Sequence, residues 1–224
     1  MKKFISCFLI LLMMSTVLLT GCGDKKKGPV LPPTRLGTKG MSSASLEKEY
    51  GFESALMDAD LVAHIRVGDW LSEKTESLIT YYRADIIDKY KGDETGNIVL
   101  LQDGCSNVTF EGYPLFTHGN ELLVFCKSAV GVEYSNAYWI IGSFTTVLDA
   151  VTSESGEIYY MDRYGAFGDR SRELVNYESQ TQLKAELKSS AMKKDSMVSD
   201  MEYNYSYIFK ASDVEALVMK KLQK

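Results

Sequence analysis

The feature that most constrains this chain is a succession of short apolar segments, rich in aromatic and β-branched residues, that begins at Leu61. In the first segment, 61–67, apolar and polar residues alternate with the two-residue period of a strand that buries one face. The second segment runs from Leu78 to Tyr90 and ends at a Lys-Gly-Asp turn signal. Further segments follow at 98–101, 122–126 and 138–141. Short strands at this spacing predict a closed or nearly closed β-barrel.

After these segments, the sequence predicts a hairpin and two helices. The apolar stretches 147–151 and 157–161 flank a Ser-Glu-Ser-Gly turn, which is typical of a hairpin. Residues 171–194 contain few helix breakers and include apolar residues four positions apart, which predicts an amphipathic helix. A last helix is expected to begin at Ser212, because Glu215 follows three residues later as in a capping box.

Two shorter elements complete the predicted domain. Residues 46–57 are expected to form a short helix that leads into it, and 203–209 one more strand. The region 46–224 is long enough for a single globular domain with its own core. We expect this domain to be mainly β with C-terminal helices, with a barrel over 46–165 and a helical extension over 166–224.

The N-terminus has the layout of an exported protein. Lys2 and Lys3 precede an uncharged apolar run, 4–19, that is shorter than the ~20 residues needed to cross a bilayer comfortably. The run ends in small residues, and charged residues follow it instead of more apolar sequence. Residues 1–21 are therefore predicted to be a signal peptide.

The end of this segment resembles a bacterial lipobox. Leu19-Thr20-Gly21-Cys22 matches the pattern, and the resemblance implies that diacylglycerol joins the sulfur of Cys22, with fatty acyl chains such as palmitate as the anchor. The alternative is a free cysteine near an ordinary cleavage site. Residues 22–45 contain few apolar side chains and are expected to be a flexible tether. The expected location is the cell membrane, with the domain on the extracytoplasmic side.

The charge balance argues against nucleic acid as a partner. The chain has 25 Lys and Arg against 30 Asp and Glu, and removal of Lys2 and Lys3 with the signal peptide would change its net charge from −5 to −7. No basic patch is present in the sequence, whereas nucleic-acid-binding domains carry one. The expected partners are membrane lipid, through Cys22, and an envelope protein or glycan.

Two of the four cysteines fall within the predicted domain. Cys7 would leave with the signal peptide and Cys22 would carry lipid, so Cys105 and Cys126 remain. In an oxidising exported setting, an even pair predicts a disulfide bond. The alternative is two separately buried thiols, which are common for cysteine.

The stretch from Ala59 to Ser143 resembles the netrin-like module, the OB-type barrel of tissue inhibitors of metalloproteinases. The resemblance rests on Ala-Asp-Leu-Val at 59–62, Tyr-Lys-Gly at 90–92, Cys105, and Glu-Leu-Leu-Val-Phe at 121–125. It covers under half of the chain and implies an OB-like barrel, followed here by two helices, with loops that bind other molecules. Those inhibitors chelate zinc through a free N-terminal cysteine, a mechanism that does not carry over because Cys22 is expected to be lipidated.

Few residues point to catalysis or to metal binding. The histidines are His64 and His118, whereas a catalytic zinc site usually takes three protein ligands, often histidines. His64 falls on the polar face of the first strand and is expected to face solvent, and His118 is expected in a turn. We therefore predict no metal site, no cofactor and no catalytic residue.

The loop from Gly104 to His118 is the predicted binding element. It places aromatic residues among Gly, Asn and Thr between two strands, and loops of this length are often functional. Tyr113 and Phe116 flank a proline and are expected to be presented to a partner. The alternative is that the loop caps the open end of the barrel, in which case both side chains belong to the core.

These features favour a non-enzymatic binding or interaction module of the cell envelope, held at the membrane as an exported lipoprotein. The alternative is an envelope hydrolase that acts on cell-wall glycan. Asp85 with Asp88, or Asp58 with Asp60, could supply the two carboxylates that glycoside hydrolysis uses. A catalytic pair that converges in one pocket would favour the hydrolase.

Overall fold

The computed structural model describes residues 40–42, 48–110, 113–162, 165–168, 174, 182, 183, 185–187, 189 and 207–223, with the backbone alone for 40–42. Every described residue belongs to the unit Leu31–Lys224. The predicted signal peptide, Cys22 and most of the predicted tether lie outside the described residues. Among the described helices, none has the length and apolar character that a membrane span requires.

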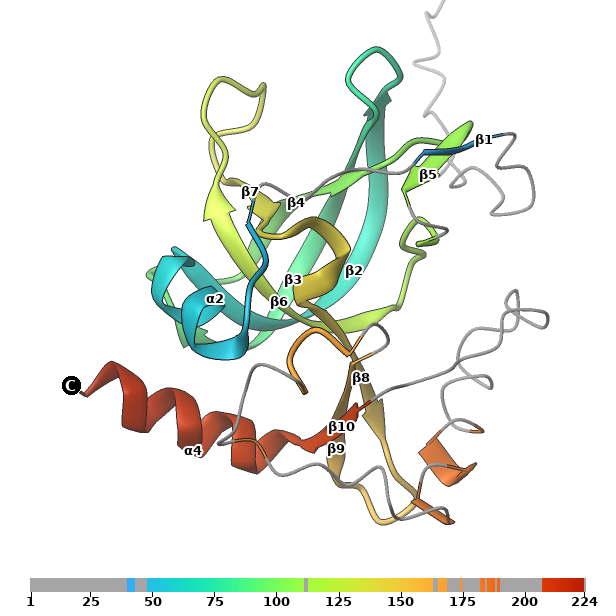
Figure 1. Cartoon of the computed structure of the whole chain (residues 1–224). Helices are drawn as coiled ribbons and strands as arrows, with labels where there is room; N and C mark the ends of the chain where they lie inside the picture. The colour runs from blue at the N-terminus through green and yellow to red at the C-terminus, as the bar shows by residue number, and fades with distance from the viewer. Residues whose placement is uncertain are drawn as a thin grey trace, which may run out of the picture. The chain divides into compact units, whose positions relative to one another are not determined.

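Five strands close into a barrel (Figure 1). They are β2 (Leu61–Lys74), β3 (Ile79–Lys91), β4 (Asn97–Asp103), β6 (Glu121–Ser128) and β7 (Ala137–Ile140). Around the ring the order is β2-β3-β4-β7-β6 and back to β2, and all pairs are antiparallel except β4 with β7, which are parallel. This closed barrel confirms the mainly β fold that the sequence predicts, and it is compatible with an OB-fold.

The two faces of β2 serve two separate cores. Ala63 and Ile65 pack inside the barrel, whereas Val62 belongs to a second core on the outer face of the barrel. Because successive side chains of a strand point to opposite faces, His64 also lies on the outer side. The register between β2 and β3 shifts at several points, and such bulges increase the bend of a strand. The bulges therefore help two long strands to curve around a closed ring.

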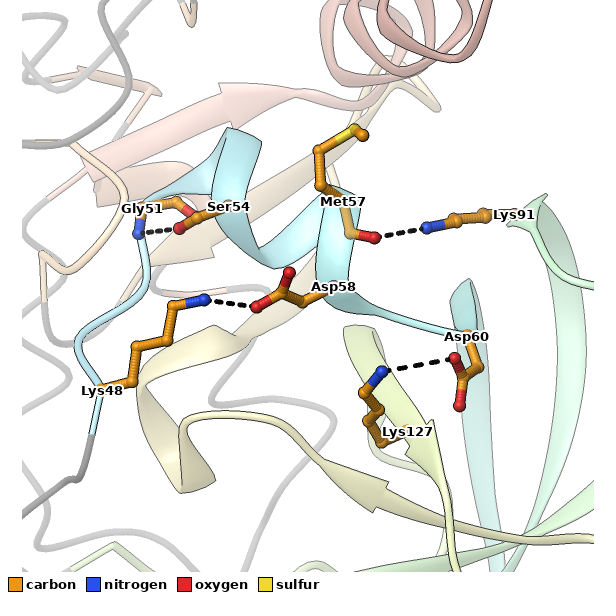
Figure 2. A network of polar contacts seen from close by, with 8 residues as sticks. All are labelled: Lys48, Gly51, Ser54, Met57, Asp58, Asp60, Lys91 and Lys127. Atoms are coloured by element: carbon orange, nitrogen blue, oxygen red, sulfur yellow. Dashed lines mark hydrogen bonds and ion pairs between the residues drawn. The ribbon is translucent and has the colours of Figure 1, made fainter.

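Helix α2 (Phe52–Asp58) packs against the outer face of β6. It is shorter than the helix predicted over 46–57, because residues 48–50 are not helical and Gly51, with an extended backbone, is the N-cap. The N–H of Gly51 donates to Ser54 Oγ at 3.0 Å, as Figure 2 shows. At the other end, Lys91 Nζ donates to the Met57 carbonyl at 3.0 Å. A cation at this position satisfies a carbonyl that the helix leaves unpaired.

Three more strands extend the sheet beyond β6. They are β8 (Val147–Thr152), β9 (Ile158–Asp162) and β10 (Tyr207–Lys210). The predicted hairpin is confirmed, because β8 and β9 pair antiparallel on either side of the turn. β10 overlaps the end of the strand predicted over 203–209 and continues past it to Lys210. It pairs antiparallel with β9. The barrel ring is thus complete at β7. The strands β8, β9 and β10 lie outside the ring, and we call them the extension.

Helix α4 (Ala211–Leu222) follows β10 directly. Its N-cap position is Lys210, with no side-chain cap, so the capping box predicted at Ser212 is wrong. With no loop between β10 and α4, Ser212 already lies in the first helical turn. The apolar side of α4 packs into the outer core through Val214, Leu217 and Val218.

The remaining elements are short. Of the helix predicted over 171–194, the described residues from 182 onwards are helical. A 3₁₀ helix, η2 (Ser143–Thr146), links β7 to β8. Strand β1 (Gly40–Ser42) pairs in parallel with β5 (Val108–Phe110), so the predicted tether includes a short ordered strand.

Candidate functional site

An open groove of about 430 Å³ lies where the outer face of the barrel meets the extension. Its walls come from the end of β3, the β8–β9 turn, β9, β10 and α4. The polar residues that line it are Asp88, Lys89, Tyr90, Glu157, Tyr160, Lys210, Ser212 and Glu215. The groove thus joins residues from distant parts of the sequence through the pairing of β9 with β10 and the direct passage from β10 into α4.

His64 stands behind the groove, between the barrel and the extension. It is 1% exposed, so the prediction that it faces solvent is wrong. The outer face of β2 is polar at His64 but is covered by the extension, whose Tyr160 ring lies edge-on to the imidazole with 5.8 Å between centroids. A strand pattern alone cannot reveal such a cover.

Neither ring nitrogen of His64 has a hydrogen-bond partner among the described residues. Nδ1 lies 3.6 Å from Asp88 Oδ2, and Nε2 lies 3.7 Å from Glu121 Oε2. Both distances exceed a hydrogen bond. Burial lowers the pKa of His64, against the opposing effect of Glu121 and Asp88. The imidazole is therefore uncharged at neutral pH.

The pKa of His64 predicts a loss of stability in mild acid. The unfolded chain protonates this residue near its ordinary pKa of 6.5, whereas the folded protein resists protonation. Because the unfolded state then binds more protons, the free energy of unfolding should fall as the pH decreases below about 6.5 towards the lowered pKa. Urea unfolding at a series of pH values should show a shallower fall for His64→Leu. Parallel curves for the two proteins would contradict this prediction.

Two tyrosine hydroxyls meet in the wall of the groove. The hydroxyl oxygens of Tyr90 and Tyr160 lie 2.6 Å apart in a hydrogen bond. Burial raises the pKa of both phenols, and the nearby carboxylates of Asp88 and Glu215 raise it further. Both tyrosines therefore keep their protons at neutral pH. Asp88 and Glu215 act on both phenols, so both carboxylates lie near this pair of hydroxyls.

The charged residues of the groove are unevenly paired. Lys210 forms an ion pair with Glu157. Asp88 faces the uncharged His64, and neither Asp88 nor Glu215 pairs with a lysine or arginine within the described part of the chain. Among the described residues, the groove therefore presents two carboxylates that form no ion pair with a lysine or arginine, and Lys89 lines the same groove.

Tyr113 and Phe116, the predicted binding residues, lie inside the barrel. They are 6% and 3% exposed and belong to the interior core. The side chain of Gln102 holds the loop down, because it accepts from the N–H of Phe116 at 2.8 Å and donates to the carbonyl of Pro114 at 2.9 Å. The hypothesis of a presented loop is wrong in this structure, and the alternative of a loop that caps the barrel is right.

The predicted disulfide is not formed, because Cys105 and Cys126 are two separate buried thiols. Cys126 pairs in register with Leu61, the first residue of β2. Cys105 adjoins Ser106, whose backbone N–H donates to Glu73 near the other end of that strand. The thiols are thus separated by most of the length of β2, whereas a disulfide needs Cα atoms within about 7 Å.

We expect two free thiols per chain when the mature protein is unfolded without reductant. Burial raises the pKa of Cys126, so in the folded protein its thiol should react far more slowly than in the unfolded chain. Titration with a chromogenic thiol reagent, before and after unfolding, measures both states. Absence of any titratable thiol after unfolding would show that the two cysteines are bridged.

Neither acidic pair considered for glycan hydrolysis lines the groove with both of its members. Asp58 pairs with Lys48, and Asp60 pairs with Lys127 at 3.6 Å (Figure 2). Asp88 lines the groove but Asp85 does not. The exposed His118 lies 3.9 Å from Asp69, outside the groove. Within the described residues, no three His, Cys, Asp or Glu side chains gather as metal ligands.

No protein-family model matches the chain, and no curated protein matches its sequence. The groove is therefore interpreted from its own geometry. No sequence motif links the residues of the groove. The sequence analysis considered Asp88 for glycan hydrolysis and placed Glu215 in a capping box. The sequence contains one signal for the groove, a histidine on an otherwise alternating strand. Its meaning depends on the extension that covers it.

Proposed function

We propose that this protein is an exported lipoprotein, anchored through lipid on Cys22, whose domain is a non-enzymatic binding module of the cell envelope. The signal-peptide layout and the lipobox support the anchor, since two acyl chains suffice for stable attachment to a membrane. An OB-like, netrin-like barrel supports a binding role, and the ligand site is the groove between β3, β9, β10 and α4.

The assignment of the site rests on a buried histidine behind the groove that has no hydrogen-bond partner among the described residues. Buried polar groups are nearly always hydrogen-bonded, and one without a partner costs stability. His64 is such a group within the described part of the chain, with carboxylate oxygens 3.6 Å from one ring nitrogen and 3.7 Å from the other. Groups with perturbed protonation beside a cleft are typical of functional sites.

The chemistry of the groove suits binding better than nucleophilic catalysis. The hydroxyls of Tyr90 and Tyr160 are bonded to each other and keep their protons. The thiol of Cys126 lies in the barrel interior instead of beside His64. Activated nucleophiles are instead held against a general base. A partner molecule held by charge and hydrogen bonds is the role that this arrangement supports.

Site-specific photo-cross-linking in intact cells tests the proposed binding site. We expect benzoylphenylalanine at Met219, which lines the groove and is 49% exposed, to form covalent adducts with the ligand. The matched control is the same probe at Val130, which is 92% exposed and lies outside the groove. Adducts at Val130 alone, or at neither position, would reject the groove as the binding site.

A further inference from the structure

The two carboxylates of the groove point to the chemical class of its ligand. We infer that the groove binds an organic cation carried on an aliphatic chain, with Asp88 and Glu215 as its charged contacts. This chemistry is that of a lysine or arginine side chain and of a free polyamine. The inference rests on the proposed binding function, and it adds the ligand class to it.

Asp88 and Glu215 approach one space from two different elements. Asp88 lies near the end of β3 and Glu215 on the second turn of α4, and both line the groove. Both influence the hydroxyls of Tyr90 and Tyr160, so the two carboxylates flank the same hydrogen-bonded pair. A cation between them would gain two charge-assisted contacts, which are roughly twice as strong as neutral hydrogen bonds.

The positive groups near the groove do not cancel the charge of its carboxylates. Lys210 is already paired with Glu157. Lys89 also lines the groove, and its register with Ala63, a residue of the barrel interior, places it on the other face of β3 from Asp88. The N-terminus of α4 carries only about half a positive charge, and its first turn includes Asp213. Three acidic and two basic residues line the groove, so a net negative charge remains and a cation is favoured over an anion.

His64 supplies the second, independent observation. Its ring is 1% exposed, has no hydrogen-bond partner among the described residues, and directs Nδ1 towards Asp88. A charged residue at this position would neutralise Asp88, whereas the uncharged imidazole leaves the carboxylate available to a ligand. The groups that face His64 are Asp88 on β3, Glu121 on β6, Arg66 on β2 and Tyr160 on β9.

The aliphatic part of the ligand has its own contact surface. Met219 is 49% exposed on α4, one turn beyond Glu215, and Ile158 lines the opposite wall on β9. Side chains four residues apart lie on one face of a helix. An alkyl chain could therefore lie along Met219 while its charged end reaches Glu215 and Asp88.

Titration of the full chain in zwitterionic detergent tests this ligand class. Methionine methyl groups are labelled with carbon-13, and the Met219 signal is assigned by its loss in Met219→Leu. The probes are short blocked peptides that contain lysine, arginine, norleucine or glutamate, together with free spermidine. We expect saturable shifts of the Met219 signal with the cationic probes and not with norleucine or glutamate. Tighter binding of a cationic peptide than of spermidine would assign a protein side chain as the source, and the reverse order a free polyamine.

The combined variant Asp88→Asn with Glu215→Gln should weaken binding of the lysine peptide by at least about tenfold, because each lost contact involves charge. Asp85→Asn is the matched control, since it removes the same charge from the same strand outside the groove, and it should bind as wild type does. Equal binding of the norleucine peptide, preference for glutamate, or no shift with any cation would overturn the inference. If cross-linking at Met219 succeeds despite such a result, the ligand class is wrong and the binding function stands; if cross-linking fails as well, both fail.

Discussion

Replacement of Phe116 by alanine is expected to lower the free energy of unfolding by about 3–5 kcal/mol, the range for a buried aromatic side chain. Phe116 is 3% exposed, and its ring lies against those of Tyr82 and Tyr113 in the barrel, with centroids 5.7 Å and 5.9 Å away. Truncation would leave a cavity where the loop closes the barrel. Since native domains are stable by about 5–15 kcal/mol, this is a large fraction of the total.

Urea unfolding followed by circular dichroism measures this effect. Val130→Ala is the matched control, because its side chain is 92% exposed and surface substitutions usually change stability by less than about 0.5 kcal/mol. If Phe116→Ala unfolds at the same urea concentration as wild type, the loop does not close the barrel, and Phe116 becomes available to a partner after all.

Replacement of Cys22 by alanine is expected to release the protein from the membrane. Each buried CH₂ of an acyl chain contributes about 0.8 kcal/mol, so a diacylglyceryl anchor holds a protein far more firmly than one chain does. Without Cys22 there is no sulfur for the lipid to join. Cell fractionation should find the wild type with the membranes and Cys22→Ala outside them.

The barrel was predictable because its strands carry local signals. Alternation at Leu61 onwards, the turn at Gly92 and the Ser-Glu-Ser-Gly hairpin all depend on neighbouring residues. Gly92 adopts a φ of +103°, and a Cβ there would lie 2.7 Å from the carbonyl oxygen of Asp60, which explains why glycine stands at this turn. Element boundaries were less predictable: α2 begins at Phe52, after an extended N-cap at Gly51, and not at residue 46 as the sequence predicts.

The groove was not predictable, because it depends on which face of the barrel the extension covers. His64 looks solvent-facing in a strand pattern and becomes buried only when Tyr160 packs against it. Cys105 and Cys126 are close in sequence, yet they lie at opposite ends of β2. These outcomes follow from tertiary packing, for which periodicity and spacing contain no signal.

Metabolic labelling with an alkyne-tagged fatty acid tests the lipid anchor most directly. The wild-type chain should incorporate the label and partition into a detergent phase, whereas Cys22→Ala should do neither. Cys7→Ala is the matched control, since it removes a cysteine from the predicted signal peptide and should leave labelling unchanged. Persistent labelling of Cys22→Ala, or a wild type that is unlabelled and soluble without detergent, would contradict the assignment of this protein as a lipoprotein.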